Sequence, residues 1–269
     1  MGGRRATVPG IWRRRLNRVW PAGVVAAMVA VGAVTAGAGA AVPRAGLATA
    51  IATAAGRLTV PSDARQLIVV SSTTADPAPP GYLATLRAYA RAGPQAPWRL
   101  VFGPWAAETG YGHLRAERRE GDGATPIGVF GIGGTLYGDA PDPGGLHEPY
   151  RRLVCGDWWD EDPASPRYNM FVSVPCGVTP GFAAGSEALW TETVAYPYFA
   201  VVRFNVDPIV RGPGAPGSGI FLHSWVGGAT AGCIALPRAR LLDVLRWLAP
   251  SARPVIAIGT QRDLAGIGD

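Results

Sequence analysis

The chain has 269 residues, and its 25 basic residues are all arginine, against 19 acidic residues, for a formal net charge of +6. Six arginines lie in residues 1–18, and the 19 that follow balance the 19 acidic residues, so the rest of the chain has no basic excess for binding nucleic acid. Because the sequence contains no lysine, a Walker-type phosphate loop and Schiff-base chemistry are excluded.

The first 41 residues have the pattern of an export signal. The arginines of residues 1–18 precede an uncharged run of Ala, Val and Gly over 22–42, and small residues around 38–41 permit cleavage. The run is about 20 residues long, so it could instead remain as a membrane anchor. We therefore expect residues 1–41 to be a signal peptide or signal anchor, and the protein to be exported to the cell envelope or secreted.

The chain beyond the leader is expected to form one mainly β domain. Residues 42–64, rich in Ala, Thr and Gly, are interpreted as a linker, residues 65–262 as the domain, and residues 263–269 as a tail. Strand-like runs separated by Gly, Pro and Asp turns recur along the domain, most of which is therefore expected to be β. These runs cover residues 66–73, 98–102, 127–132, 167–174, 198–206, 219–223 and 254–258.

Two segments of the domain are predicted to be helical. Residues 82–92 are the first. The second is 237–249, where Pro237 suits a first helical turn and four leucines form one apolar stripe. The predicted fold class is therefore mainly β with about two helices.

Three cysteines leave one without a partner in an exported protein. Cys155 and Cys176 are separated by a strand-like segment and flanked by glycine turns, which favours a disulfide across neighbouring strands. Cys233 is then the odd thiol. An unpaired cysteine in an oxidising compartment is either reactive or deeply buried, and the cysteine count does not decide between the two.

A histidine and the odd cysteine lie ten residues apart across a glycine-rich turn. A cysteine attacks as its thiolate, so it needs an imidazole or a cluster of backbone N–H groups to lower its pKa. His223, near the end of a strand-like run, could supply the imidazole, and the turn from Thr230 to Cys233 could supply the N–H groups. The small side chain of Gly232 leaves its N–H and that of Cys233 open to an oxyanion. We expect the thiol to be partly exposed.

No metal or cofactor is expected. One cysteine with one histidine gives too few ligands for zinc. The acidic turn over 157–162 lacks the glycine and the later glutamate of a calcium loop. The G-x-G-x-x-G pattern at 212–217 contains two prolines and leads into a strand, whereas a dinucleotide fingerprint must open a helix.

Two segments resemble the L,D-transpeptidase catalytic domains that remodel bacterial peptidoglycan. Residues 120–130, with the sequence EGDGATPIGVF, are similar to the turn-and-strand signature of that family. Residues 223–236 are similar to its catalytic segment, in which a histidine precedes Ser/Thr-x-Gly-Cys. The resemblance spans about residues 66–260 and implies a mixed β-sandwich.

The same resemblance implies roles for individual residues. Cys233 would be the nucleophile and His223 the base, with an oxyanion pocket at Gly232 and Cys233. Ser224 would orient the imidazole through its carbonyl, and Thr230 occupies the Ser/Thr position of the motif. No cofactor is required.

The implied substrate is a peptidoglycan stem peptide. The thiolate would attack the amide between the L-centre of a diamino acid and the following D-alanine, and the thioester would pass to an amine or to water. The first outcome is a cross-link and the second is L,D-carboxypeptidase trimming. Membrane contact would be through an uncleaved leader only.

The sequence also departs from the family pattern. Ala231 stands where family members commonly have His or Arg, Ala235 where they have Arg or Asn, and the interval from histidine to cysteine is shorter. These differences place the chain in a divergent subgroup. They leave a second interpretation open, a catalytically silent exported protein that binds the cell wall with the same fold.

Overall fold

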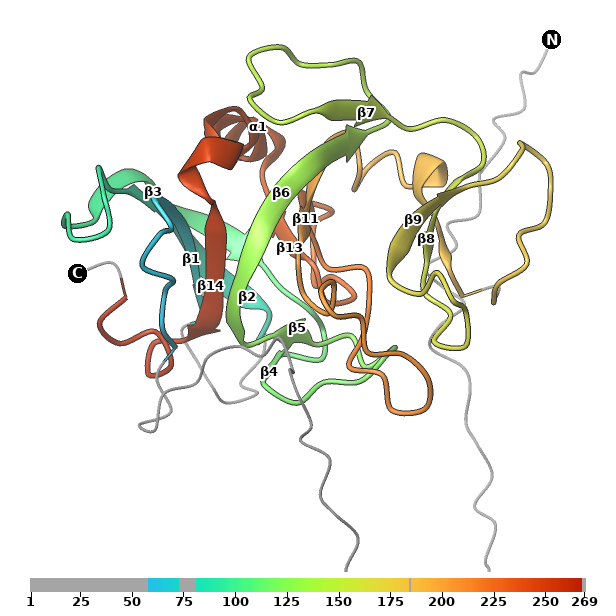
Figure 1. The fold of residues 1–269 in the computed structure, drawn as a ribbon, viewed down its shortest axis with the longest axis horizontal. Helices are drawn as coiled ribbons and strands as arrows, with labels where there is room; N and C mark the ends of the chain where they lie inside the picture. Colours follow the sequence, from blue (N-terminus) through green and yellow to red (C-terminus); the bar gives the residue numbers. More distant parts are fainter. Residues whose placement is uncertain (1–57, 73–80, 184, 268–269) are drawn as a thin grey trace, which may run out of the picture. The chain divides into compact units, whose positions relative to one another are not determined.

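Strands account for most of the regular secondary structure of the described residues, which confirms the prediction of a mainly β fold. The computed structural model describes residues 58–72, 81–183 and 185–267 (Figure 1), so the expected leader and most of the expected linker lie outside the described residues. None of the helices in those three ranges is long and apolar enough to span a bilayer. The strands are β1 Gln66–Ser72, β2 Leu83–Ala90, β3 Arg99–Glu108, β4 Leu114–Arg115, β5 Thr125–Pro126, β6 Gly128–Gly138, β7 Tyr150–Arg152, β8 Asp157–Asp160, β9 Met170–Ser173, β10 Glu187–Ala188, β11 Phe199–Val202, β12 Phe221–Ser224, β13 Ile234–Leu236 and β14 Val255–Thr260.

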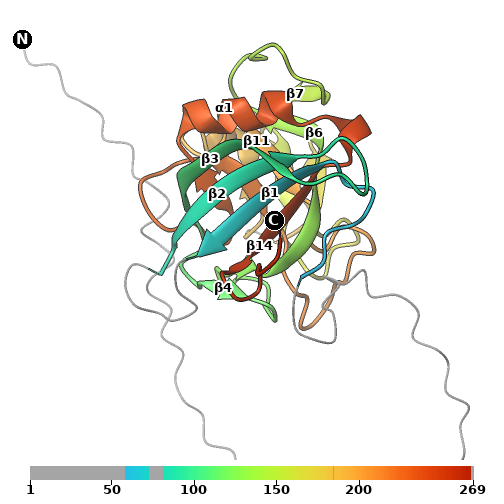
Figure 2. The ribbon, with the colours of Figure 1, turned by 90° about the vertical axis from the view of Figure 1, so that its left-hand side faces the viewer.

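The largest sheet has nine strands in the order β11-β12-β13-β3-β2-β1-β14-β6-β7. Because β11 also pairs with β6, all of these strands except β7 form a closed ring. The sheet is mixed: β1 is parallel to β14 and β12 is parallel to β13, while most other pairs are antiparallel. In Figure 2, β2, β1 and β14 lie side by side below α1.

The prediction of a helix over 82–92 is wrong, because this segment forms β2. The strand pairs antiparallel with β1 on one side and with β3 on the other. Ala84, Leu86 and Ala88 are buried and alternate with partly exposed residues, which is the two-residue period of a strand. The alanine and leucine content favours a helix only weakly, and pairing on both edges outweighs that preference.

The second predicted helix is confirmed as α1, Arg238–Trp247, the only α-helix in the described ranges. Pro237 stands just before it as the N-cap residue. Leu241, Val244 and Leu245 of the helix pack into the main core with residues of the strand ring. Among the described residues, two short 3-10 helices, η2 Leu189–Thr191 and η3 Pro250–Ala252, are the other helical elements.

The two faces of β12 and β13 contact different parts of the core. Leu222, Ile234 and Leu236 belong to the main core cluster with α1. Phe221 and Cys233 belong instead to a second, largely aromatic cluster. The cysteine singled out in the sequence therefore lies on the face turned away from the helix.

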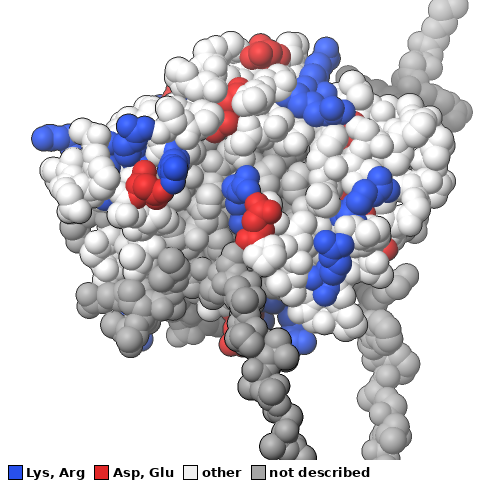
Figure 3. Space-filling view, viewed as in Figure 1, with Lys and Arg blue, Asp and Glu red and all other residues white. Residues whose placement is uncertain are grey.

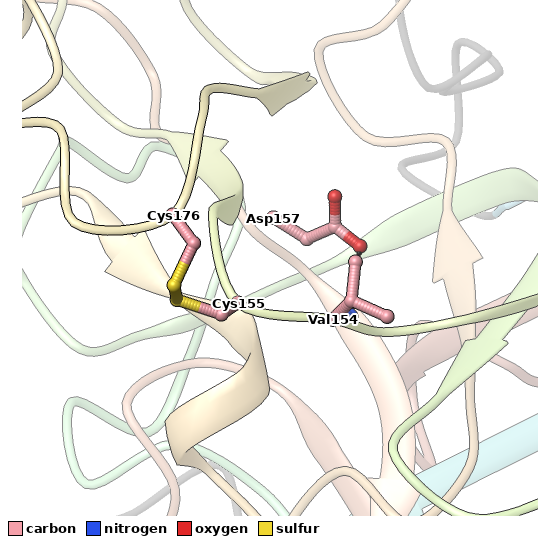
Figure 4. The surroundings of a disulfide bond; sticks show 4 residues. All are labelled: Val154, Cys155, Asp157 and Cys176. Atoms are coloured by element: carbon pink, nitrogen blue, oxygen red, sulfur yellow. Dashed lines mark hydrogen bonds between the residues drawn. A yellow bond between two sulfur atoms is a disulfide. The ribbon is translucent and has the colours of Figure 1, made fainter.

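A smaller sheet, β10-β8-β9, carries the disulfide. Cys155 just before β8 and Cys176 just after β9 are bonded, the pair that the cysteine count favours, and Cys233 is left as the free cysteine of the described residues. Asp157 accepts a hydrogen bond of 3.0 Å from the Val154 N–H beside the disulfide (Figure 4). Closing a loop of about 22 residues stabilises the fold by roughly 3 kcal/mol on the chain-entropy account.

Residues just outside the expected bounds of the domain, 65–262, also belong to its core. Leu58, in the expected linker, and Leu264, in the expected tail, are both buried in a cluster with residues of β1 and β14.

On the face shown in Figure 3, arginine and acidic side chains lie in small separate groups. That distribution agrees with the equal numbers of arginine and acidic residues beyond residue 18.

Candidate active site

The parallel pairing of β12 with β13 brings His223 and Cys233 onto one face. His223 is opposite Ala235 and Leu222 is opposite Ile234, so continuing the register by one residue places Cys233, just before β13, beside Phe221. Side chains two residues apart on a strand share a face, and paired residues do so across strands. The imidazole and the thiol are therefore diagonal neighbours on the face away from α1.

The Cys233 thiol is buried, with only 7% of the residue exposed, so the expectation of partial exposure is wrong. Its sulfur accepts a hydrogen bond of 3.3 Å from the Phe221 N–H, and the thiol donates one of 3.2 Å to the Gly219 carbonyl. Burial raises the pKa of the thiol well above its ordinary value; the charge of Glu187 raises it further, while the Phe221 N–H opposes the shift. The thiol is therefore protonated at neutral pH.

The His223 imidazole is buried and fixed in one tautomer. Its Nδ1 lies 2.7 Å from the Ser224 carbonyl oxygen, which can only accept, so Nδ1 carries the proton and Nε2 has a free lone pair. Burial lowers the pKa of His223 to about 4, although the hydrogen bond to Ser224 acts in the opposite direction. A neutral imidazole with Nε2 unprotonated has the form required of a general base.

Within the described ranges, no hydrogen bond joins the imidazole to the Cys233 sulfur. The Tyr196 ring packs edge-on against the imidazole, with 5.4 Å between ring centroids. Catalytic hydrogen bonds are often long without substrate and form only in the complex. The pair therefore has the right placement and tautomer, but not the contact, for proton transfer in this state.

The turn before Cys233 is held by Thr230. Its hydroxyl donates to the Cys233 carbonyl at 2.7 Å and accepts from the Gly232 N–H at 3.2 Å. The Gly232 N–H, expected to be open to an oxyanion, is thus engaged within the turn. Gly232 has φ +129° and a Cβ there would lie 2.8 Å from the Ala124 carbonyl oxygen, so this position requires glycine.

Thr125 links the segment over 120–130 to the turn before Cys233. Its hydroxyl donates to the Gly232 carbonyl at 2.8 Å and accepts from the Gly110 N–H at the same distance. Asp122 fixes the preceding turn by accepting from the Ala124 N–H at 2.9 Å. Thr125 stands inside the signature segment, but the sequence alone gave no signal for its contact with the cysteine turn.

A buried carboxylate on the same face was also missed. Glu108, at the end of β3, is 3% exposed and pairs in register with Ala235. Its carboxylate accepts from the Gly228 N–H at 3.1 Å and from the Trp225 side chain. Burial raises the pKa of Glu108, and both hydrogen bonds oppose the shift. The predicted strand ended at residue 102, so only the pairing of β3 with β13 shows this placement.

The low pKa of His223 predicts a loss of stability in acid. The unfolded histidine, with its ordinary pKa of 6.5, binds more protons than the folded one, with a pKa of about 4. This contribution is complete above pH 6.5 and is lost as the pH falls toward 4, to a limit of about 3 kcal/mol. Urea unfolding from pH 7 to pH 4 should show the wild type losing more stability than His223→Gln, whereas parallel pH curves would contradict the assignment.

Comparison with known proteins gives one match. The model of the L,D-transpeptidase catalytic domain family matches residues 67–256, which is more than half of the chain. The match includes the segment over 120–130 as well as His223 and Cys233. No curated protein and no solved structure gives a significant match.

Proposed function

Because the chain belongs to the L,D-transpeptidase catalytic domain family, we propose that it is an exported cysteine acyltransferase acting on peptidoglycan stem peptides. The bond broken is the amide between the L-centre of a diamino acid and the following D-alanine. The observation that supports this most is the placement of Cys233 and His223 on one strand face, with the imidazole held as the Nδ1–H tautomer by Ser224.

The first half of the reaction forms a thioester. As the sulfur of Cys233 bonds to the substrate carbonyl carbon, its proton passes to Nε2 of His223. The tetrahedral intermediate then breaks its C–N bond, and the imidazolium returns the proton to the departing amine of D-alanine. Because the resting thiol is protonated, proton transfer accompanies the attack rather than preceding it.

The second half releases the acyl group. The amine of a second stem attacks the thioester carbonyl and gives a proton to His223, which returns it to the departing sulfur. The product is a cross-link, and water in place of the amine gives a trimmed stem. The N–H groups of Gly232 and Cys233 are the proposed oxyanion donors, so the Gly232 N–H exchanges its bond to Thr230 for one to the substrate.

A carbapenem-like acylating probe tests the proposal directly. The folded wild-type protein should gain the mass of one probe, and peptide mapping should place it on Cys233. A protein that takes up no probe and turns over no stem would instead support the catalytically silent wall-binding function. The burial of the thiol and the engaged Gly232 N–H are the observations that favour that alternative.

Export is part of the proposal and makes a separate prediction. The arginine-rich leader and the disulfide between Cys155 and Cys176 both point to a compartment outside the cytoplasm. N-terminal sequencing of protein from the cell envelope or medium should find a mature chain beginning near residue 42. Recovery of the intact leader on protein from the cytoplasmic fraction would argue against it.

A further inference from the structure

Glu108 occupies the same row of the sheet as the catalytic histidine. In the register of the large sheet, Glu108 of β3 is opposite Ala235 of β13, which is opposite His223 of β12. All three side chains therefore share the face that also carries Cys233. The side chain between the carboxylate and the imidazole is only the methyl group of Ala235.

This carboxylate is buried without a cation. Glu108 is 3% exposed, and none of the ion pairs among the described residues includes it. Its hydrogen-bond partners are the Gly228 N–H and the Trp225 side chain, both uncharged. A buried carboxylate is costly to the fold unless it is paired with a positive charge.

The carboxylate can accept further hydrogen bonds. An ionised carboxylate has about four acceptor positions, and Gly228 and Trp225 use only part of them. Both partners belong to the turn after β12, in which Trp225 and Val226 are exposed. A ligand for the carboxylate would therefore have to replace contacts made by this short turn, in which Gly227 has φ +85°.

We infer that Glu108 is the binding group for a primary ammonium of the diamino-acid substrate, held beside the thiol and imidazole on the same strand face. The inference rests on the proposed function for the identity of the substrate. An ammonium supplies the missing positive charge and donates up to three hydrogen bonds to the carboxylate. The ammonium comes either from the side chain of the diamino acid in the donor stem or from the same group in the acceptor stem.

Binding without turnover is the first test. In Cys233→Ala protein, a tetrapeptide stem with a free side-chain amine should bind at least about 10-fold more tightly than the same stem with that amine acetylated. Adding Glu108→Gln, which keeps the size of the side chain, should bring the two affinities within about 2-fold of each other. Glu117→Gln, at an exposed carboxylate, is the matched control and should keep the preference.

Kinetics distinguish the two sources of the ammonium. If it belongs to the donor, Glu108→Gln should remove the preference of the acylation step for the free-amine stem. If it belongs to the acceptor, Glu108→Gln should leave acylation unchanged and slow release of a preformed acyl-enzyme by a diamino acid, with release by water unaffected. Glu108→Asp, which keeps the charge, should restore part of either effect.

A merely structural role for Glu108 would weaken binding of free-amine and acetylated stems alike. The inference is overturned if Cys233→Ala binds the two stems equally and Glu108→Gln leaves aminolysis unchanged. It is also overturned if Glu108→Gln alters no preference in binding or kinetics. Failure of the proposed function is a different result, namely no acylation of wild-type protein by any stem, and the binding test does not depend on it.

Discussion

Replacing Cys233 with alanine is expected to abolish both acylation by a carbapenem-like probe and turnover of tetrapeptide stems. The sulfur is the atom proposed to form the thioester, and the other two cysteines are joined in a disulfide. The change removes one buried atom and its hydrogen bonds to Phe221 and Gly219. Its cost in unfolding free energy should therefore stay within about 1 to 2 kcal/mol.

Intact-protein mass spectrometry and urea unfolding check the two parts of this prediction. Cys233→Ser is the matched variant, since its hydroxyl can keep the contacts to Phe221 and Gly219 but is a far weaker nucleophile. Probe labelling or stem turnover by a folded Cys233→Ala protein would show that the nucleophile lies elsewhere.

Replacing His223 with glutamine should slow acylation by roughly 100-fold or more. Nε2 of the neutral imidazole is the proposed acceptor of the thiol proton, and burial keeps that thiol protonated at neutral pH. Glutamine can still donate to the Ser224 carbonyl, but its amide is not a base at neutral pH.

The chain offers two matched controls for this variant. His113→Gln and His147→Gln change histidines that lie in loops outside the strand face of Cys233, so both should acylate at the wild-type rate. Stopped-flow or quenched-flow labelling gives the rates. Equal rates for His223→Gln and the controls would mean that another group accepts the proton.

The sequence predicted the strands whose local pattern is strong and failed where pairing decided the structure. β1, β14 and α1 are apolar runs or stripes of the right period, and each was placed within a few residues. The segment that forms β2 is rich in alanine and leucine, which hide its strand pattern in the sequence. The alternation of buried and more exposed side chains is seen only in the structure, where β2 lies between β1 and β3. The three residues of β13 are too few to give any periodic signal.

The residues of the candidate site show the same contrast between local sequence pattern and long-range pairing. His223 and Cys233 could be proposed together because they are ten residues apart and joined by a turn that glycine permits. Thr125 and Glu108 lie more than a hundred residues before Cys233 in sequence, so only the pairing of distant strands and turns brings them to the cysteine. The burial of the thiol could not be predicted either, because it depends on the aromatic cluster around Phe221.

The closed ring of strands also affects how copies of this chain meet one another. A sheet that pairs its first strand with its last removes two edge strands, whose unpaired N–H and C=O groups are the usual template for aggregation between molecules. The closure is partial here, because β13 pairs with β3 through Ala235 and Glu108 alone, so most of β3 pairs with β2 only. At the end of the strand order lies β7. Strand β7 is three residues long, and two of its residues are the exposed arginines Arg151 and Arg152; charged side chains on an edge strand disfavour its pairing with a second copy.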